Sequence, residues 1–188
     1  MERIRSFVAI LLNDEVRAAV AAEIACLQSL APRVGWVAAP NLHLTLKFLG
    51  ELPPDALEQV KDGLTEAVAG AAPFRLHFYG LGAFPGMARP RVLWVGVAEG
   101  GQAAQALQAR VEAGLCRRGF PREERPFSPH LTVGRVREPR GVAGLQEAMA
   151  RDARVDFGRL EVRALSLMRS DLSPGGSRYT ELAAFPLS

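Results

Sequence analysis

Two short runs of this chain repeat one pattern, a histidine and a threonine two residues apart on an alternating, strand-like background. His43 precedes Thr45 in the first run, and His130 precedes Thr132 in the second, 87 positions later. Side chains two residues apart lie on one face of a β-strand, so each run predicts a strand with an apolar side and a polar side. The pair favours a degenerate internal duplication whose two lobes face each other across a cleft.

The alternation also predicts which way the neighbouring side chains point. In the first run, Leu42, Leu44, Leu46 and Phe48 are expected to face inward, opposite His43, Thr45 and Lys47. In the second run the next inward position is Arg135, which a core would not accept unpaired. We therefore expect the second strand to end or twist near Gly134.

The chemistry of the two polar sides suits phosphodiester hydrolysis. Imidazole has an unperturbed pKa near neutrality, so one histidine can take a proton from water while the other protonates a leaving oxygen. Thr45 and Thr132 would donate to the non-bridging phosphate oxygens, and Lys47 and Arg135 would add positive charge.

The structural alternative is that each histidine is a packed strand residue and each threonine a good strand former. The duplication disfavours this reading for the two motifs, whereas His77 lacks the threonine and is expected to be an ordinary strand residue. Spacing alone does not assign the acid and the base, because the motifs are nearly interchangeable.

The residues around the motifs extend the pattern and resemble a known family. The blocks are Trp36-Val37, Pro40 to Gly50, Arg91 to Gly96, Ser128 to Arg135 and Leu167 to Thr180. In this order they are similar to the two-histidine phosphoesterases, and among these to the RNA 2',3'-cyclic phosphodiesterases, also called 2'-5' RNA ligases.

The resemblance implies opening of RNA 2',3'-cyclic phosphate ends to 2'-phosphomonoesters, without metal or other cofactor, and a reversible 2'-5' joining of RNA ends. It implies His43 as proton donor and His130 as proton acceptor. It also implies an α+β bilobal fold, in which two antiparallel sheets related by approximate twofold symmetry carry helices on their outer faces and flank a central catalytic groove.

Composition is compatible with this reading. The chain has 188 residues, 48% of them hydrophobic, and a net charge of +3, which favours a polyanionic partner only mildly. Residues 1–188 are expected to form a single domain. Arginines gather in sequence around His130 and predict attraction of phosphate. We expect Arg135 to contact the substrate. The arginines of this group are Arg117, Arg118, Arg122, Arg125, Arg135, Arg137 and Arg140.

Cys26 and Cys116 fall in helical patterns without metal-ligand spacing, and we expect reduced, buried thiols. No segment resembles a signal peptide or reaches membrane-spanning length, which favours a cytoplasmic protein. We further expect a monomer acting on RNA ends or cyclic nucleotides.

Helices are predicted from Asn13 to Leu30, Pro53 to Ala69, Gly101 to Arg117 and Val142 to Ala150. The other predicted strands are Ile4 to Leu12, Phe74 to Phe84, Arg91 to Val97, Gly158 to Met168 and Tyr179 to Pro186.

Two other functions remain open at this stage. A noncatalytic RNA or nucleotide binder would keep the groove without needing imidazoles of complementary protonation. A metal hydrolase is disfavoured, because the sequence has no H-E-x-x-H motif, no cysteine pair and only one spare histidine.

Overall fold

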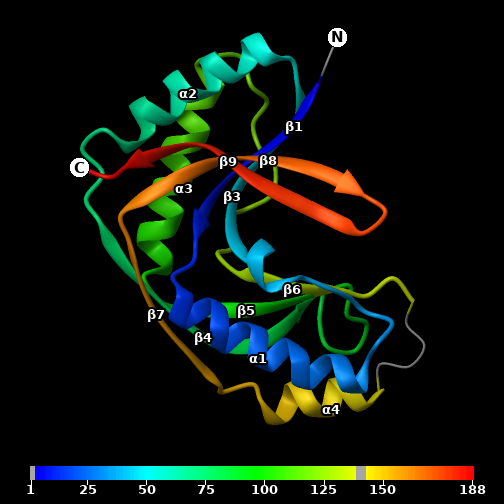
Figure 1. Cartoon of the computed structure of the whole chain (residues 1–188). Coiled ribbons are helices and arrows are strands. Elements are labelled where there is room, and N and C mark those ends of the chain that lie inside the picture. The colour runs from blue at the N-terminus through cyan, green and yellow to red at the C-terminus, as the bar shows by residue number, and fades with distance from the viewer. Residues whose placement is uncertain (1–2, 139–142) are drawn as a thin grey trace.

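The computed structural model describes residues 3–138 and 143–188, and Figure 1 traces the chain through its helices and strands. In chain order the elements are β1 (Ile4–Leu11), α1 (Asp14–Leu30), β2 (Gly35–Trp36), the 3-10 helix η1 (Ala39–Asn41), β3 (His43–Leu52), α2 (Pro54–Val68), β4 (Phe74–Phe84), β5 (Val92–Glu99), α3 (Gly101–Cys116), β6 (Leu131–Arg135), α4 (Ala143–Arg151), β7 (Asp156–Val162), β8 (Ala164–Ser173) and β9 (Gly176–Pro186).

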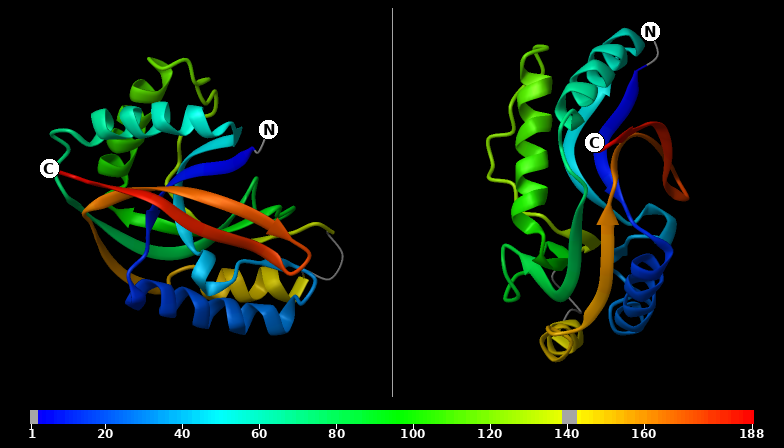
Figure 2. Two further views of the ribbon diagram at one scale, coloured as in Figure 1. Left: turned by 45° about the horizontal axis from the view of Figure 1, so that its top comes forward. Right: turned by 90° about the vertical axis from the view of Figure 1, so that its left-hand side faces the viewer.

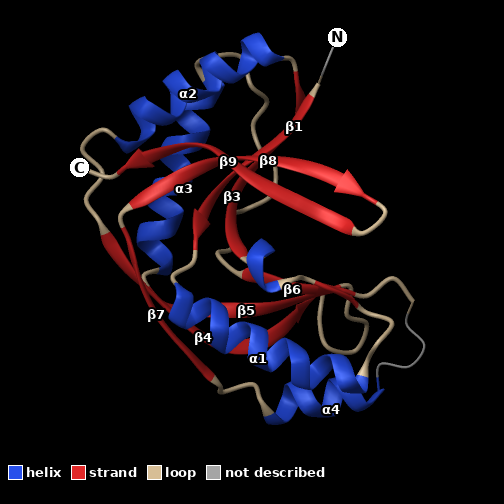
Figure 3. Ribbon diagram, viewed as in Figure 1, coloured by secondary structure: helices blue, strands red, loops and turns tan. Residues whose placement is uncertain are grey.

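The strands form two antiparallel sheets (Figure 3). The first sheet has the order β3-β1-β8-β9 and the second the order β2-β6-β5-β4-β7. In the first sheet the motif strand β3 pairs with β1, and helix α1 lies between these strands in the chain. In the second sheet the motif strand β6 pairs with β5, and helix α3 lies between them. This correspondence confirms the predicted α+β fold with two related antiparallel sheets.

The helices tie the two sheets together. Helix α1 follows β1 of the first sheet but packs against β7 of the second, next to α4. Helix α3 joins two strands of the second sheet but packs against β3 of the first, next to α2 (Figure 1, Figure 2). Each connecting helix therefore covers a strand of the opposite sheet.

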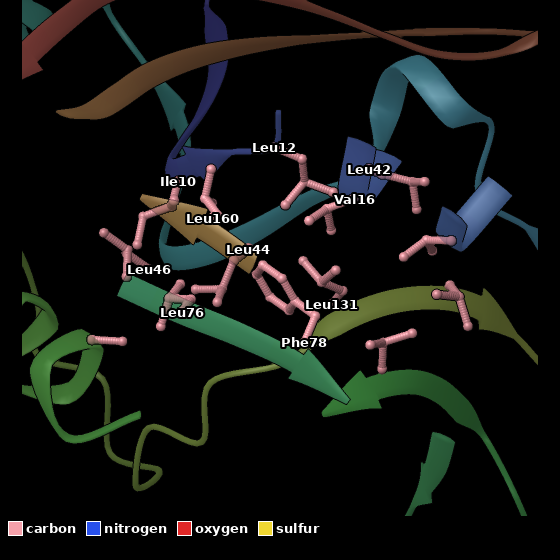
Figure 4. Packing of buried hydrophobic residues seen from close by; sticks show 14 of the residues in the cluster. Ile10, Leu12, Val16, Leu42, Leu44, Leu46, Leu76, Phe78, Leu131 and Leu160 are labelled. Atoms are coloured by element: carbon pink, nitrogen blue, oxygen red, sulfur yellow. The ribbon is translucent and has the colours of Figure 1, made fainter. Parts of the chain in front are cut away.

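The core between these layers is continuous. Leu44 of β3, Leu131 of β6 and Phe78 of β4 are each fully buried and belong to one hydrophobic cluster (Figure 4). A smaller cluster of Phe7, Ala9 and Met168 lies on the opposite face of the first sheet. Because strand side chains alternate between faces, β1 contributes Val8 and Ile10 to the large cluster and Phe7 and Ala9 to the small one.

Local signals in the sequence set most element boundaries. Asn13 caps α1, since its side-chain oxygen accepts a hydrogen bond from the Val16 amide at 3.0 Å. Helix α2 begins at Pro54, where a missing amide hydrogen costs nothing. The predicted helices and most predicted strands are therefore present within one or two residues of their expected bounds.

Two expectations need correction, and one strand is present that was not expected. The strand predicted from Gly158 to Met168 is two strands, because the chain passes from β7 in the second sheet to β8 in the first at residue 163. The short strand β2 was not predicted. Cys26 and Cys116 are free but exposed, because the buried stripes of α1 and α3 pass through other positions such as Ile24 and Leu115. The predicted start of the fourth helix at Val142, like Arg140, lies outside the described residues.

Candidate active site

His43 is the first residue of β3, and only Leu42 separates it from the 3-10 turn η1. The turn is fastened to β9, because the side-chain amide of Asn41 donates a hydrogen bond to the Ser177 carbonyl at 2.6 Å. The segment that carries His43 is therefore held by a strand at the far end of the chain.

Hydrogen bonds define the tautomer of His43. Its Nδ1 lies 2.7 Å from the carbonyl oxygen of Asn41, and its Nε2 lies 2.9 Å from Oγ1 of Thr45. A carbonyl oxygen can only accept, so Nδ1 carries the hydrogen and donates it. In the neutral ring Nε2 is then the basic nitrogen and accepts from Thr45.

Aromatic side chains enclose His43 on two sides. Its ring centroid lies 4.7 Å from that of Phe7 and 5.3 Å from that of Tyr179, the latter edge-on. Burial among them lowers the pKa of His43 below its ordinary value, and the hydrogen bond to the Asn41 carbonyl offsets part of this effect.

His130 repeats the arrangement in the second sheet. It stands directly before β6, and its Nδ1 lies 2.7 Å from the carbonyl oxygen of Ser128, again two residues upstream. The same argument places the hydrogen on Nδ1 and leaves Nε2 as the basic nitrogen. Phe84 contacts this ring edge-on at a centroid distance of 5.1 Å.

Both motif strands contain a β-bulge at the third residue after the histidine. In β3, Val8 pairs with Lys47 and Ala9 with Thr45, so Leu46 is the extra residue. In β6, Leu93 pairs with Gly134 and Trp94 with Thr132, so Val133 is the extra residue. A bulge reverses the alternation of the residues beyond it.

The bulge in β6 decides where Arg135 lies. Arg135 pairs with Val92, two residues before the Trp94 that pairs with Thr132, so Arg135 and Thr132 share a face. The arginine is exposed at the end of the strand. The predicted twist near Gly134 is thus present, and it turns Arg135 out of the core.

The bulge in β3 overturns two predictions. Phe48 does not face inward: it pairs with Phe7, lies on the face of His43 and is 61% exposed. Lys47 instead turns into the core, where its Nζ lies 2.7 Å from Oε1 of Glu112 and 2.9 Å from the Pro121 carbonyl oxygen. Its charge is neutralised there and is not available to a substrate.

Other charged residues have structural partners. Arg117 and Arg118 both bind the carboxylate of Glu66, so these two members of the predicted basic cluster are ion-paired. His77 is buried on β4, and its Nε2 lies 2.9 Å from Oδ1 of Asp156. His77 is therefore the strand residue that the sequence predicted.

The two motif strands lie against each other. Strands β3 and β6 are in contact although they belong to different sheets, and their apolar sides meet in the large cluster. The carbonyls of Asn41 and Ser128 and the rings of Phe7, Tyr179 and Phe84 complete the surroundings of the histidines. Backbone carbonyls carry no sequence signal, so these two hydrogen-bond acceptors could not be predicted.

Within residues 3–138 and 143–188, no group of three or more histidine, cysteine, aspartate or glutamate side chains is arranged to hold a metal ion. Over the same residues, no helix combines the length and the apolar character that crossing a bilayer requires.

Comparison with known proteins places the chain in a family. The family model of the 2'-5' RNA ligase superfamily matches residues 14–174. The chain belongs to this superfamily. A relative from Methanothermobacter thermautotrophicus named RNA 2',3'-cyclic phosphodiesterase is 35% identical over 98% of this chain and 100% of its own length. The predicted family is confirmed, and the predicted class of enzyme agrees with the name of this relative.

Two solved structures share the fold. TT0787 of Thermus thermophilus is 34% identical, covers 98% of each chain and superimposes with a TM-score of 0.77. LigT of Escherichia coli, crystallised with 3'-AMP, is 27% identical and superimposes with a TM-score of 0.78 over 100% of this chain and 99% of its own.

Proposed function

We propose that this member of the superfamily hydrolyses RNA 2',3'-cyclic phosphate ends to 2'-phosphomonoesters, with His43 and His130 as a general acid and base. The observation that carries the proposal is the repeated environment of the two imidazoles, each with Nδ1–H donating to a carbonyl two residues upstream. The names of the relatives support the activity, and the 3'-AMP bound by LigT supports a nucleotide ligand.

In the proposed reaction each basic Nε2 handles one proton. His130 accepts a proton from a water molecule, whose oxygen attacks phosphorus in line with the 3' oxygen. The bond from phosphorus to the 3' oxygen breaks, and protonated His43 gives its proton to that oxygen. The 2'-phosphomonoester and a free 3'-hydroxyl result. If the 5'-hydroxyl of a second RNA end attacked in place of water, the same step would form a 2'-5' linkage and a free 3'-hydroxyl. Each proton transfer contributes about 10²- to 10⁴-fold in rate.

The neighbouring polar groups would stabilise the charge that develops on the non-bridging oxygens. When His43 is protonated, Nε2 no longer accepts from Oγ1 of Thr45, so the threonine hydroxyl can donate to a phosphate oxygen while Nε2–H faces the leaving oxygen. Thr132 would act in the same way beside His130, and Arg135 would contribute its guanidinium from the same face. No metal ion takes part in this proposal.

The test is hydrolysis of an RNA oligonucleotide ending in a 2',3'-cyclic phosphate, in EDTA, with mapping of the product. We expect a 2'-phosphate product, and a loss of at least about 100-fold in kcat for His43→Ala and for His130→Ala. His77→Gln is the matched control, because it changes the remaining histidine and should keep the wild-type rate.

Wild-type rates in both motif variants would disprove the acid-base assignment. Loss of the reaction in EDTA would point to a metal-dependent enzyme. Binding of the oligonucleotide without any turnover would indicate the noncatalytic binder.

A further inference from the structure

A hollow of about 180 Å³ lies on the face of the first sheet that carries His43. Its walls include Phe7, Phe48, Tyr179 and Arg5. Phe7 and Tyr179 are also the two rings that contact His43. The hollow therefore lies behind the rings that flank His43 and shares them with the candidate active site.

A second hollow of about 170 Å³ continues along the sheet and shares Arg5, Glu51 and Ser170 with the first. Arg5 marks how far the two hollows extend from the motif, because Leu11 of β1 pairs with His43, whereas Arg5, six residues earlier on the same strand, pairs with Glu51. Six residues of strand correspond to roughly 20 Å. Arg5 is therefore farther from His43 than the ribose and base of a single nucleotide can extend when its phosphate lies at His43.

The side chains along this path suit a nucleic acid strand. Phe48 presents a ring that is 61% exposed, which is unusual for a strand phenylalanine and suits stacking against a base. Glu51 is engaged by Arg3, whose Nε lies 3.8 Å from Oε2. In the part of the chain that the structure describes, no carboxylate forms an ion pair with the exposed Arg5, so its guanidinium can bind a phosphate.

We propose that the two hollows form a subsite for the nucleotide that precedes the cyclic-phosphate nucleotide of an RNA strand. Phe48 stacks on its base, and Arg5 binds a backbone phosphate on its 5' side. This inference rests on the proposed function, and it makes oligonucleotides, not mononucleotide 2',3'-cyclic phosphates, the preferred substrates.

The test compares kcat/KM for a 2',3'-cyclic mononucleotide and for a trinucleotide that ends in the same cyclic nucleotide. We expect the wild type to prefer the trinucleotide and Phe48→Ala to reduce that preference by roughly 5- to 150-fold, as expected for one lost base stack. Arg5→Ala should lower the salt dependence of the trinucleotide reaction by about 0.7 in the log-log slope, as expected for one phosphate contact.

Two substitutions away from the hollows are the controls. Leu30→Ala removes another exposed apolar side chain, on α1, and Arg75→Ala removes another exposed arginine, on β4. Both should leave the substrate preference and the salt slope at wild-type values.

Equal losses on both substrates in Phe48→Ala would overturn the inference, because the ring would then serve the terminal nucleotide. If the wild type turned over neither substrate, the proposed function would fail, and binding would still test the subsite. Fluorescence anisotropy with a labelled trinucleotide 3'-phosphate and 3'-AMP as competitor should then show weaker trinucleotide binding in both variants. Unchanged binding would overturn the subsite as well.

Discussion

At the scale of single residues, the two motif histidines differ in their surroundings although their backbone hydrogen bonds match. His43 is enclosed by Phe7 and Tyr179 and bonded to Thr45, and this burial lowers its pKa. A lowered pKa means that the ring is neutral over more of the pH range than an ordinary histidine. The proposed donor would thus take up its proton when an anionic ligand enters, because a nearby negative charge favours imidazolium.

This coupling gives a test by NMR. We expect the ring signals of His43, assigned by comparison with His43→Ala, to titrate below the ordinary histidine range of about 6.5. Added sulfate, whose charge is constant between pH 5 and 8, should raise that midpoint, so sulfate should bind more tightly as the pH falls. A midpoint above the ordinary range, or one insensitive to sulfate, would contradict the account.

At the scale of elements, a buried ion pair connects the two motif segments. Lys47 on β3 binds Glu112 on α3, and Oε2 of Glu112 accepts from the Glu123 amide at 3.3 Å. With the Pro121 carbonyl as a second acceptor for Lys47, these bonds fasten β3 to the loop that leads to His130.

Removing one partner should be costly. Glu112→Ala leaves the ammonium of Lys47 buried and unpaired, so we expect the free energy of unfolding to fall by about 3–5 kcal/mol in urea titrations. The double variant Lys47→Met with Glu112→Leu should recover most of this loss. Glu58→Ala, which breaks an exposed pair with Lys61, should cost less than about 1 kcal/mol. If Glu112→Ala also lowered the free energy of unfolding by less than about 1 kcal/mol, the proposed role of the buried pair would be refuted.

Helices α2 and α3 approach each other at a pair of glycines. A Cβ atom at Gly114 would lie 2.4 Å from the carbonyl oxygen of Gly63, which real structures do not allow. We expect Gly114→Ala to force the helices apart and to lower the free energy of unfolding by about 1–3 kcal/mol, measured by thermal denaturation.

Gly144 on α4 is the matched control for this substitution. A Cβ atom there would meet nothing within 4 Å, so alanine should stabilise the helix by about 0.4–1 kcal/mol. Similar effects of both substitutions would show that the crossing tolerates side chains.

At the scale of the whole molecule, the exchange of helices between the sheets and the continuous core favour cooperative unfolding. Trp36 and Trp94 both lie in the second sheet, whereas far-UV circular dichroism follows both sheets. We expect tryptophan fluorescence and circular dichroism to give the same unfolding midpoint. Two separate midpoints would mean that the lobes unfold independently. The single domain, the monomeric state and the cytoplasmic location stay predictions.

Local sequence was sufficient to predict the polar and apolar sides at the start of the motif strands, the helix boundaries and the family. These features depend on periodicity, caps and a specific set of motifs, which are properties of neighbouring residues. His43 and Thr45 share a face because they are two apart in an extended chain, whatever lies beside them.

The directions of the side chains beyond each motif depend instead on how the strands pair in the folded chain. The bulges at Leu46 and Val133 arise from pairing with β1 and β5, and they turn Phe48 and Arg135 onto the faces of the motifs. The partner of Lys47 comes from a helix 65 residues away. Register and packing depend on residues distant in sequence, so strand alternation alone placed Phe48 and Lys47 on the wrong sides.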